Sequence, residues 1–290
     1  MLPDIITIES GRLSVKLDII DHVTQPGSRE RTNEDTYGHK GNTAWVIDAA
    51  GGLGNRRYIA NDNGHDTDAA WLAHRLSLFF RNNAPAYGGD LAGLLVAARQ
   101  NLSHQFNAAA RAVPMAGHNL PVAAVTLLHA DAGNGVKIAR LGDTVAMVQD
   151  SDYRIDGVFD NPVLRQAEAR TLAAKRKGDD LVAVQRANRA NANGENGFGV
   201  FALRDHFAPL ITQKHIPDLK SGQALLMSDG FYRLVDVFGL YDNPALMGAV
   251  QHRGLAPQLD RLRKLEHRRD SGQVKPSDDA TAMFLRIDRK

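Results

Sequence analysis

Three short apolar runs of this sequence, each long enough for one strand, adjoin aspartate residues. Two runs end at an aspartate, the third follows a pair of aspartates, and a further acidic pair lies upstream. Because the strands of a sheet bring their ends to common edges, carboxylates placed there can converge. The chain is therefore expected to build sheet and to gather acidic side chains at its edge. These residues are Glu34, Asp35, Asp48, Asp229, Asp278 and Asp279.

Clustered carboxylate oxygens are the ligands that hard divalent cations such as Mg²⁺ and Mn²⁺ prefer. The chain has no cysteine, which excludes disulfides, thiolate zinc sites, iron–sulfur clusters and a cysteine nucleophile. Its histidines show no His-Glu-x-x-His spacing, and no Gly-Lys-Ser/Thr phosphate loop occurs. An Asp-Gly pair such as Asp229-Gly230 is also an ordinary turn, so each aspartate taken singly is open to either interpretation.

Strand-like and helical segments share the chain. Period-two alternation and short apolar runs predict strands at 12–19, 43–47, 122–128, 136–148, 224–228 and 280–287. Helical spacing predicts helices at 66–80, 90–113, 161–178 and 257–269. Asp90 is the expected N-cap of the second helix, and Asn134-Gly135 favours a hairpin turn. The segment 187–199, rich in Asn, Gly and Ala, predicts a mobile loop.

The composition fits a compact protein without a membrane or nucleic-acid partner. The 290 residues are 43% hydrophobic, and neither an internal repeat nor a linker divides them, so a single domain over 1–290 is expected. The net charge of +2 gives no reason to expect nucleic acid as the main partner. No apolar run is long enough to span a membrane, and residues 1–10 lack a signal-peptide pattern. A cytoplasmic location is expected.

Five motifs give the sequence a family resemblance. They are RTNED (31–35), VIDAAGG (46–52), ARLGDT (139–144), LLMSDG (225–230) and DDAT (278–281). In this order and spacing, over residues 20–288, they resemble the motifs of the metal-dependent protein phosphatases, the PP2C-like or PPM family. The resemblance implies an α+β fold, a four-layer α-β-β-α sandwich in which two antiparallel sheets pack face to face between outer helices.

The resemblance also implies a site for two Mn²⁺ or Mg²⁺ ions per chain. Asp48 matches the carboxylate that bridges both ions in the family. Asp229 and Asp278 match ligands of one ion, with Asp278 preferred to Asp279. Ala49 stands where relatives have glycine, and its backbone carbonyl is the implied ligand. The implied metal-site residues are Glu34, Asp35, Asp48, Ala49, Asp229 and Asp278.

The implied chemistry is hydrolysis by a water that two metal ions activate. By resemblance, Glu34 and Asp35 hold metal-bound waters, and Asp48 is catalytic through the bridged ions. Arg29 and Arg31 flank the position of the phosphate-binding arginine, and Arg31 is favoured for that catalytic role. Ala50 occupies a position where eukaryotic relatives often carry a histidine that acts as a general acid.

The expected activity is that of a serine/threonine phosphoprotein phosphatase. Its implied partners are a phosphorylated protein substrate and a cognate Ser/Thr kinase. The rival hypothesis is a catalytically silent binding or regulatory module of the same fold, because Ala49 and the segment 120–123 depart from the family pattern. A solvated basic helix face is expected at 261–269.

Two metal ions and no third are expected. Many relatives hold a third ion with an aspartate four residues after the one matching Asp229, and with another near the segment 118–122. Here the first position is Arg233, and the segment 118–122 contains no carboxylate. Arg233 is expected either to attract a phosphate or an acidic substrate segment, or to point into solvent without a role.

Overall fold

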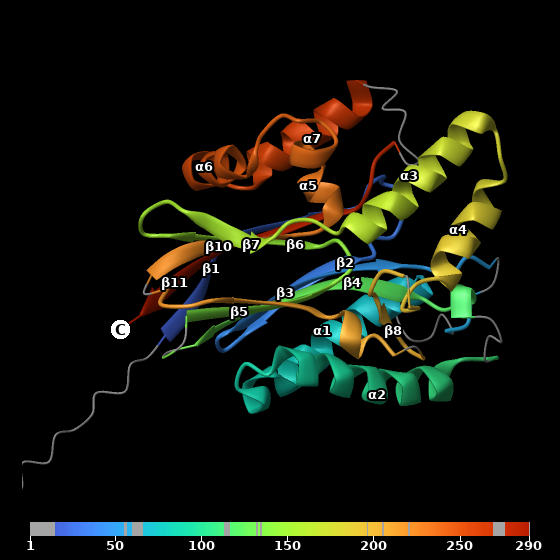
Figure 1. Ribbon diagram of the computed structural model, residues 1–290, viewed down its shortest axis with the longest axis horizontal. Helices are drawn as coiled ribbons and strands as arrows, with labels where there is room; N and C mark the ends of the chain where they lie inside the picture. The colour runs from blue at the N-terminus through green and yellow to red at the C-terminus, as the bar shows by residue number, and fades with distance from the viewer. Residues whose placement is uncertain are drawn as a thin grey trace, which may run out of the picture.

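The computed structural model describes residues 15–54, 57–59, 66–112, 117–131, 133, 135–195, 197–204, 206–219, 221–268 and 276–289. Two antiparallel sheets lie face to face, and helices cover both outer faces (Figure 1). This arrangement confirms the expected α+β four-layer sandwich.

The first sheet has five strands in the order β1-β11-β10-β6-β7. Their bounds are β1 (Val15–Gln25), β6 (Val145–Asp150), β7 (Ile155–Val158), β10 (Ser221–Met227) and β11 (Ala280–Arg289). The strand β11 pairs antiparallel with both β1 and β10. Segments from the two ends of the chain therefore lie side by side in this sheet.

The second sheet has six strands, with β2-β3-β4-β5-β9 in order and β8 paired with β4. Their bounds are β2 (Asp35–Lys40), β3 (Thr43–Ala50), β4 (Val122–Asp131), β5 (Gly135–Leu141), β8 (Phe201–Ala202) and β9 (Thr212–Ile216). The expected hairpin forms between β4 and β5, where Asp131 pairs with Gly135. Asn134 lies outside the described residues.

Helices cover the outer faces of the sandwich. The long helices α1 (Asp68–Tyr87) and α2 (Leu91–Ala109) cover the second sheet, and α5 (Asp229–Asp236), α6 (Asn243–Arg253) and α7 (Ala256–Arg268) cover the first (Figure 1). Two further helices, α3 (Pro162–Lys177) and α4 (Leu181–Ala190), lie toward one end of the sandwich. Within the described part of the chain, no helix has the length and apolar character needed to cross a membrane.

Caps fix where these helices begin. The expected N-cap Asp90 accepts a hydrogen bond from Gly93 N at 2.9 Å, and Thr67 caps α1 in the same way. The helix α3 runs between the N-cap Asn161 and the left-handed Gly178, as the sequence predicts.

The two-residue period of β3 determines which way its side chains point. Ala44 and Val46 pack in the apolar layer between the sheets, whereas Trp45 and Ile47 pack against the helices on the other face. Asp48 continues the first series and therefore lies on the face between the sheets, at the end of the apolar layer.

Two of the expected elements are wrong. The run 136–148 is not one strand, because β5 ends at Leu141 and β6 begins at Val145 in the other sheet. The segment 187–199 is not wholly a loop, because its first four residues complete α4. The strand expected at 12–19 begins, within the described residues, at Val15 and runs on to Gln25. The sequence patterns did not predict α5 or α6.

Candidate metal centre

Asp35 and Asp48 lie opposite each other on neighbouring strands. Asp35 is the first residue of β2, and it pairs directly with Asp48 of β3. Directly paired residues of an antiparallel sheet project from the same face, so both carboxylates project between the two sheets. The second sheet therefore supplies two of the expected metal ligands to one place.

The first sheet supplies the other expected ligands from the ends of β10 and β11. Asp229 is the first residue of α5, directly after β10, and Asp278 lies two residues before β11. Ser228 and Thr281 tie these ends together, since Ser228 N donates to Thr281 O at 2.9 Å and Thr281 N donates to Ser228 Oγ at 3.0 Å. The two segments that carry Asp229 and Asp278 are thus held in fixed register.

Burial and mutual repulsion raise the pKa values of these carboxyl groups. Burial, followed by the charges of Asp229 and Asp279, raises the pKa of Asp35 to about 8, although nearby Ser228 and Thr281 hydroxyls oppose the rise. Burial, followed by the charges of Asp35 and Asp229, raises the pKa of Asp48 well above its usual range. The cluster therefore resists holding its full negative charge unless cations neutralise it.

The residues present fit divalent cations. Both carboxylate oxygens of Asp35 are buried, and within the described part of the chain no donor lies at hydrogen-bonding distance and angle, although the Ser228 and Thr281 hydroxyls are close enough to act on its pKa. A buried carboxylate without partners is costly, and a hard cation is the partner that oxygen ligands of this kind take. The buried, unpartnered Asp35 beside Asp48 and Asp229 is thus the observation that marks this edge as a candidate metal centre.

Asp279 uses its carboxylate differently from Asp278. Its Oδ1 accepts from Gly27 N at 2.8 Å, and its Oδ2 accepts from Glu34 N at 2.7 Å. Both oxygens are therefore engaged with backbone, and they hold the segment that carries Glu34 and Asp35. The preference for Asp278 as the ligand stays a prediction.

Ala49 adopts ordinary extended backbone inside β3. Its N–H donates to Glu34 O at 3.3 Å, and it pairs with Ala123 of β4. The described non-glycine residues with positive φ do not include Ala49. The alanine that replaces the family's glycine therefore introduces no left-handed strain at the turn after Asp48.

Solved structures give the fold a name. A manganese-bound catalytic domain of the serine/threonine phosphatase PstP aligns with a TM-score of 0.54 at 18% identity, covering 95% of this chain and 99% of that one. Pseudomonas aeruginosa PppA aligns with a TM-score of 0.56 at 15% identity, covering 96% of this chain and 99% of that one. The PPM phosphatase MsPP of Mycobacterium smegmatis aligns with a TM-score of 0.50 at 18% identity, covering 93% of this chain and 98% of that one. The chain has the PP2C fold. No protein-family model matches the sequence, and no curated protein matches it significantly.

Asp143, Glu168 and Asp236 join the acidic cluster of this PP2C fold. None of them was proposed as a site residue from the sequence. Carboxylate oxygens of Asp143, Glu168 and Asp229 lie within 4.8 Å of one another. Burial and the charge of Asp229 raise the pKa of Asp143 well above its usual range, that of Glu168 to about 7 and that of Asp236 to about 6. The expectation of no third metal rested on Arg233 and on the absence of a carboxylate from 118–122, and it did not consider these further carboxylates. It stays a prediction.

One of these residues carried a recognisable signal. Asp143 follows the apolar strand β5, which is the same pattern that marked Asp48 and Asp229 as candidates. Glu168 of α3 and Asp236 of α5 carried no such signal. Their side chains reach solvent through an open pocket whose walls surround them with protein, so they are accessible and yet partly desolvated. All three line a pocket of about 730 Å³ between these helices, which Asp229 and Asp278 also line.

The arginines considered from the sequence differ in how far they are exposed to solvent. Arg29 and Arg31 are both exposed in the β1–β2 connection, so burial does not choose between them as the phosphate-binding group. Arg233 does not point into solvent: it is 7% exposed and its Nη1 lies 2.7 Å from Glu266 Oε1. The basic face expected at 261–269 is also partly wrong, because the side chain of Arg263 is only 14% exposed.

Proposed function

We propose that this chain is a metal-dependent serine/threonine phosphoprotein phosphatase. The observation that carries the proposal is the buried Asp35 carboxylate, without a hydrogen-bond partner in the described structure, directly opposite Asp48. The PP2C fold supports the same class of reaction. The phosphatase fits these carboxylates better than the rival silent module does, because a binding module has no need to bury several repelling charges.

In this proposal, Asp48 would hold both of two Mn²⁺ or Mg²⁺ ions, and Asp229 and Asp278 would hold one of them. The Ala49 carbonyl would be a further ligand, and Glu34 and Asp35 would orient metal-bound waters. When bound, two divalent cations supply charge stabilisation for the phosphoryl oxygens and a nucleophile at neutral pH. Arg31 is the proposed phosphate-binding group, since a guanidinium matches phosphate geometry.

The substrate in this proposal is a phosphorylated protein, and its supplier is a Ser/Thr kinase. An open pocket lined by Asp143, Glu168 and Asp278 leaves the proposed centre accessible to a phosphorylated side chain on another protein. No covalent enzyme intermediate is required, because a water molecule is the proposed nucleophile.

Hydrolysis of an aryl phosphate and of a phosphoserine peptide, with and without Mn²⁺, tests this function. We expect activity that exhaustive chelation removes and Mn²⁺ restores. Asp48→Asn should lose it, whereas Asp152→Asn should keep it, because Asp152 is exposed in the turn at the other end of β6. Activity that survives chelation would overturn the metal mechanism. A folded, Mn²⁺-loaded protein without activity would favour the silent module.

A further inference from the structure

Two arginines share one buried glutamate beneath the candidate metal centre. Arg233 Nη1 lies 2.7 Å from Glu266 Oε1, and Arg263 Nη1 lies 2.7 Å from Glu266 Oε2. The side chain of Glu266 is fully buried, and those of Arg233 and Arg263 are 8% and 14% exposed. We call these three residues the triad.

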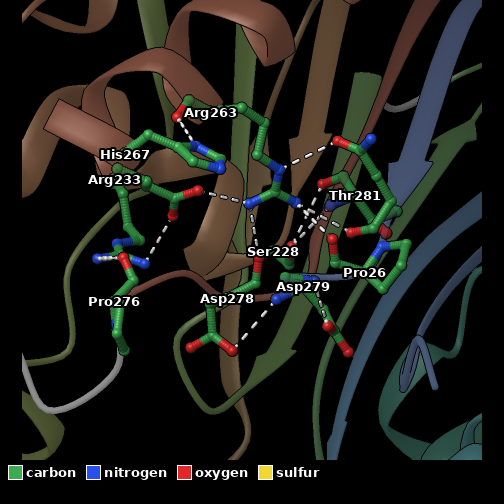
Figure 2. Close-up of polar contacts among 12 residues, drawn as sticks. Pro26, Ser228, Arg233, Arg263, His267, Pro276, Asp278, Asp279 and Thr281 are labelled. Atoms are coloured by element: carbon green, nitrogen blue, oxygen red, sulfur yellow. Dashed lines mark hydrogen bonds and ion pairs between the residues drawn. The ribbon is translucent and has the colours of Figure 1, made fainter. Parts of the chain in front are cut away.

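Arg263 joins the triad to the segment that carries Asp278. Its Nη1 also donates to the backbone carbonyl of Asp278 at 2.9 Å, and its Nη2 donates to the carbonyls of Gln25 at 3.1 Å and Pro26 at 3.2 Å. Figure 2 shows Arg263 between these two backbone segments, with the Asp278 carboxylate on the far side of its own backbone. One guanidinium therefore connects the end of β1 with the approach to β11.

Arg233 joins the triad to the helix that carries Asp229. It lies one turn after Asp229 in α5, its Nη2 donates to Pro276 O at 3.4 Å, and its guanidinium lies over the Phe238 ring at 5.6 Å. Figure 2 shows Arg233 beside Pro276. The helix α5 and the segment 276–278 are thus fastened to one another through charged side chains.

Stability alone does not explain this arrangement. Removing two cations and an anion from water carries a large desolvation cost, and apolar replacements of buried ion triads are often as stable or more so. What the triad adds is directional: each of its arginines has a planar set of donors aimed at particular carbonyls. Two of those carbonyls, of Pro276 and Asp278, lie in the segment that carries the proposed ligand Asp278.

We propose that Arg233, Glu266 and Arg263 are positioning residues that set the geometry, and hence the affinity, of the metal site formed by Asp229 and Asp278. This inference rests on the proposed metal-dependent function. None of the three touches the reacting atoms. They act through the backbone of Asp278 and through α5, in the way that outer-shell partners orient ligands elsewhere.

Calorimetric titration with Mn²⁺ of the wild type and three variants tests the triad. Glu266→Gln removes the shared anion, and Arg263→Lys keeps a positive charge but loses the planar donor set. Gln258→Ala is the matched control: Gln258 is fully buried in the same helix α7, yet its side chain bonds Tyr241, Ala249 and Gly254, away from the segment 276–278.

We expect Glu266→Gln and Arg263→Lys to weaken one Mn²⁺ site about 10- to 100-fold and to leave the other unchanged. The Mn²⁺ concentration for half-maximal hydrolysis should rise equally, while kcat at saturating Mn²⁺ is preserved. Gln258→Ala should lower the melting temperature without changing Mn²⁺ affinity. Wild-type affinity in folded Arg263→Lys and Glu266→Gln, or an equal loss in Gln258→Ala, would overturn the proposal.

Hydrogen exchange separates this inference from the proposed function. The backbone amide of Gly27 donates to Asp279 Oδ1, and that of Asp279 donates to Asp278 Oδ1. Both amides lie in the segments that Arg263 holds, so a positioning role predicts faster exchange at these amides in both triad variants without metal. If the wild type binds no Mn²⁺, the proposed metal-dependent function fails, and hydrogen exchange alone then tests whether the triad positions these segments. Unchanged exchange at these amides then overturns the positioning role, and faster exchange restricted to them supports it.

Discussion

At the scale of single residues, the adjacent carboxylates of Asp278 and Asp279 have different roles, one at the pocket and one in binding backbone N–H groups. Asp279 binds two backbone N–H groups, those of Gly27 and Glu34, and thereby joins β11 to the β1–β2 connection. Asp278 lines the pocket instead. The chain therefore places a structural carboxylate directly beside a proposed ligand.

The two neighbours should respond differently to the same substitution. Asp279→Asn exchanges one acceptor for a donor and leaves a partly buried N–H unpaired, so the free energy of unfolding should fall by about 1–3 kcal/mol. Asp278→Asn should cost little stability but more activity and Mn²⁺ affinity. Chemical denaturation and Mn²⁺ titration of both variants provide the comparison. A greater loss of activity in Asp279→Asn would mean that the ligand has been assigned to the wrong aspartate.

The raised pKa of Asp35 predicts how stability depends on pH without metal. Its pKa is about 8 in the folded protein against 3.8 for the ordinary group, so between these values the native state holds a proton that the unfolded chain has released. The free energy of unfolding of the chelated protein should therefore fall as pH rises from about 4 to about 8. The raised pKa values of Asp48, Asp143 and Glu168 act in the same direction.

Melting temperatures in chelator across this pH range measure the effect. Asp35→Asn has no carboxyl group to titrate at this position, so its profile should be flatter than that of the wild type. A melting temperature that rises with pH in chelator would contradict the buried, repelling cluster.

At the scale of elements, the β5–β6 connection carries the chain from one sheet to the other and delivers Asp143 to the cluster. Gly142 has a φ of +81°, and a Cβ built there would lie 2.4 Å from Ala124 Cβ. Its N–H donates to Gly199 O at 2.6 Å, and its carbonyl accepts from Asn161 Nδ2 at 2.9 Å. Glycine is therefore required for both its backbone angle and its lack of a side chain.

Comparing Gly142→Ala with Gly41→Ala should separate those two requirements. Gly41 also has a positive φ, +57°, but a Cβ there meets nothing within 4 Å, so its substitution should cost about 1–2 kcal/mol of conformational energy alone. Gly142→Ala should cost about 1–3 kcal/mol more because of the clash. Denaturant unfolding of both variants measures the difference. Equal losses would mean that Ala124 yields without cost.

At the scale of the whole molecule, the candidate metal centre joins the two sheets. Asp35 and Asp48 belong to the six-stranded sheet, whereas Asp229 and Asp278 adjoin strands of the five-stranded sheet. The layer between the sheets is apolar along most of its length and becomes acidic at this edge. Metal ions bound there would cross-link the halves of the sandwich at the point where their charges repel.

Mn²⁺ should therefore stabilise the whole fold. With free Mn²⁺ at about 100 times its dissociation constant, one site adds about 2.7 kcal/mol to the free energy of unfolding. Asp48→Asn should abolish most of this gain, yet its melting temperature in chelator should exceed that of the wild type, because one repelling charge is gone. Thermal unfolding of both proteins with and without Mn²⁺ measures the gain from Mn²⁺ and the difference in melting temperature in chelator. An equal Mn²⁺ response in Asp48→Asn would exclude its bridging role.

Local sequence patterns were sufficient for much of the sandwich. Short apolar runs beside aspartates predicted β3, β10 and β11, and Asp90 was the expected N-cap of α2, because each of these signals depends on neighbours in the chain. The motif order also brought Asp48, Asp229 and Asp278 into one hypothesis, and the structure places all three segments at one edge of the sandwich.

Features that depend on contacts between residues far apart in the sequence were decided only by the tertiary structure. Arg233 reads as an isolated charge in the sequence, and only the packing of α5 on α7 shows that it shares Glu266 with Arg263. The run 136–148 reads as one strand because both sheets bury it equally well, and its division at Gly142 depends on contacts with Ala124 and Gly199. Apolar periodicity is written locally, whereas a buried charge acquires its partner only when remote segments meet.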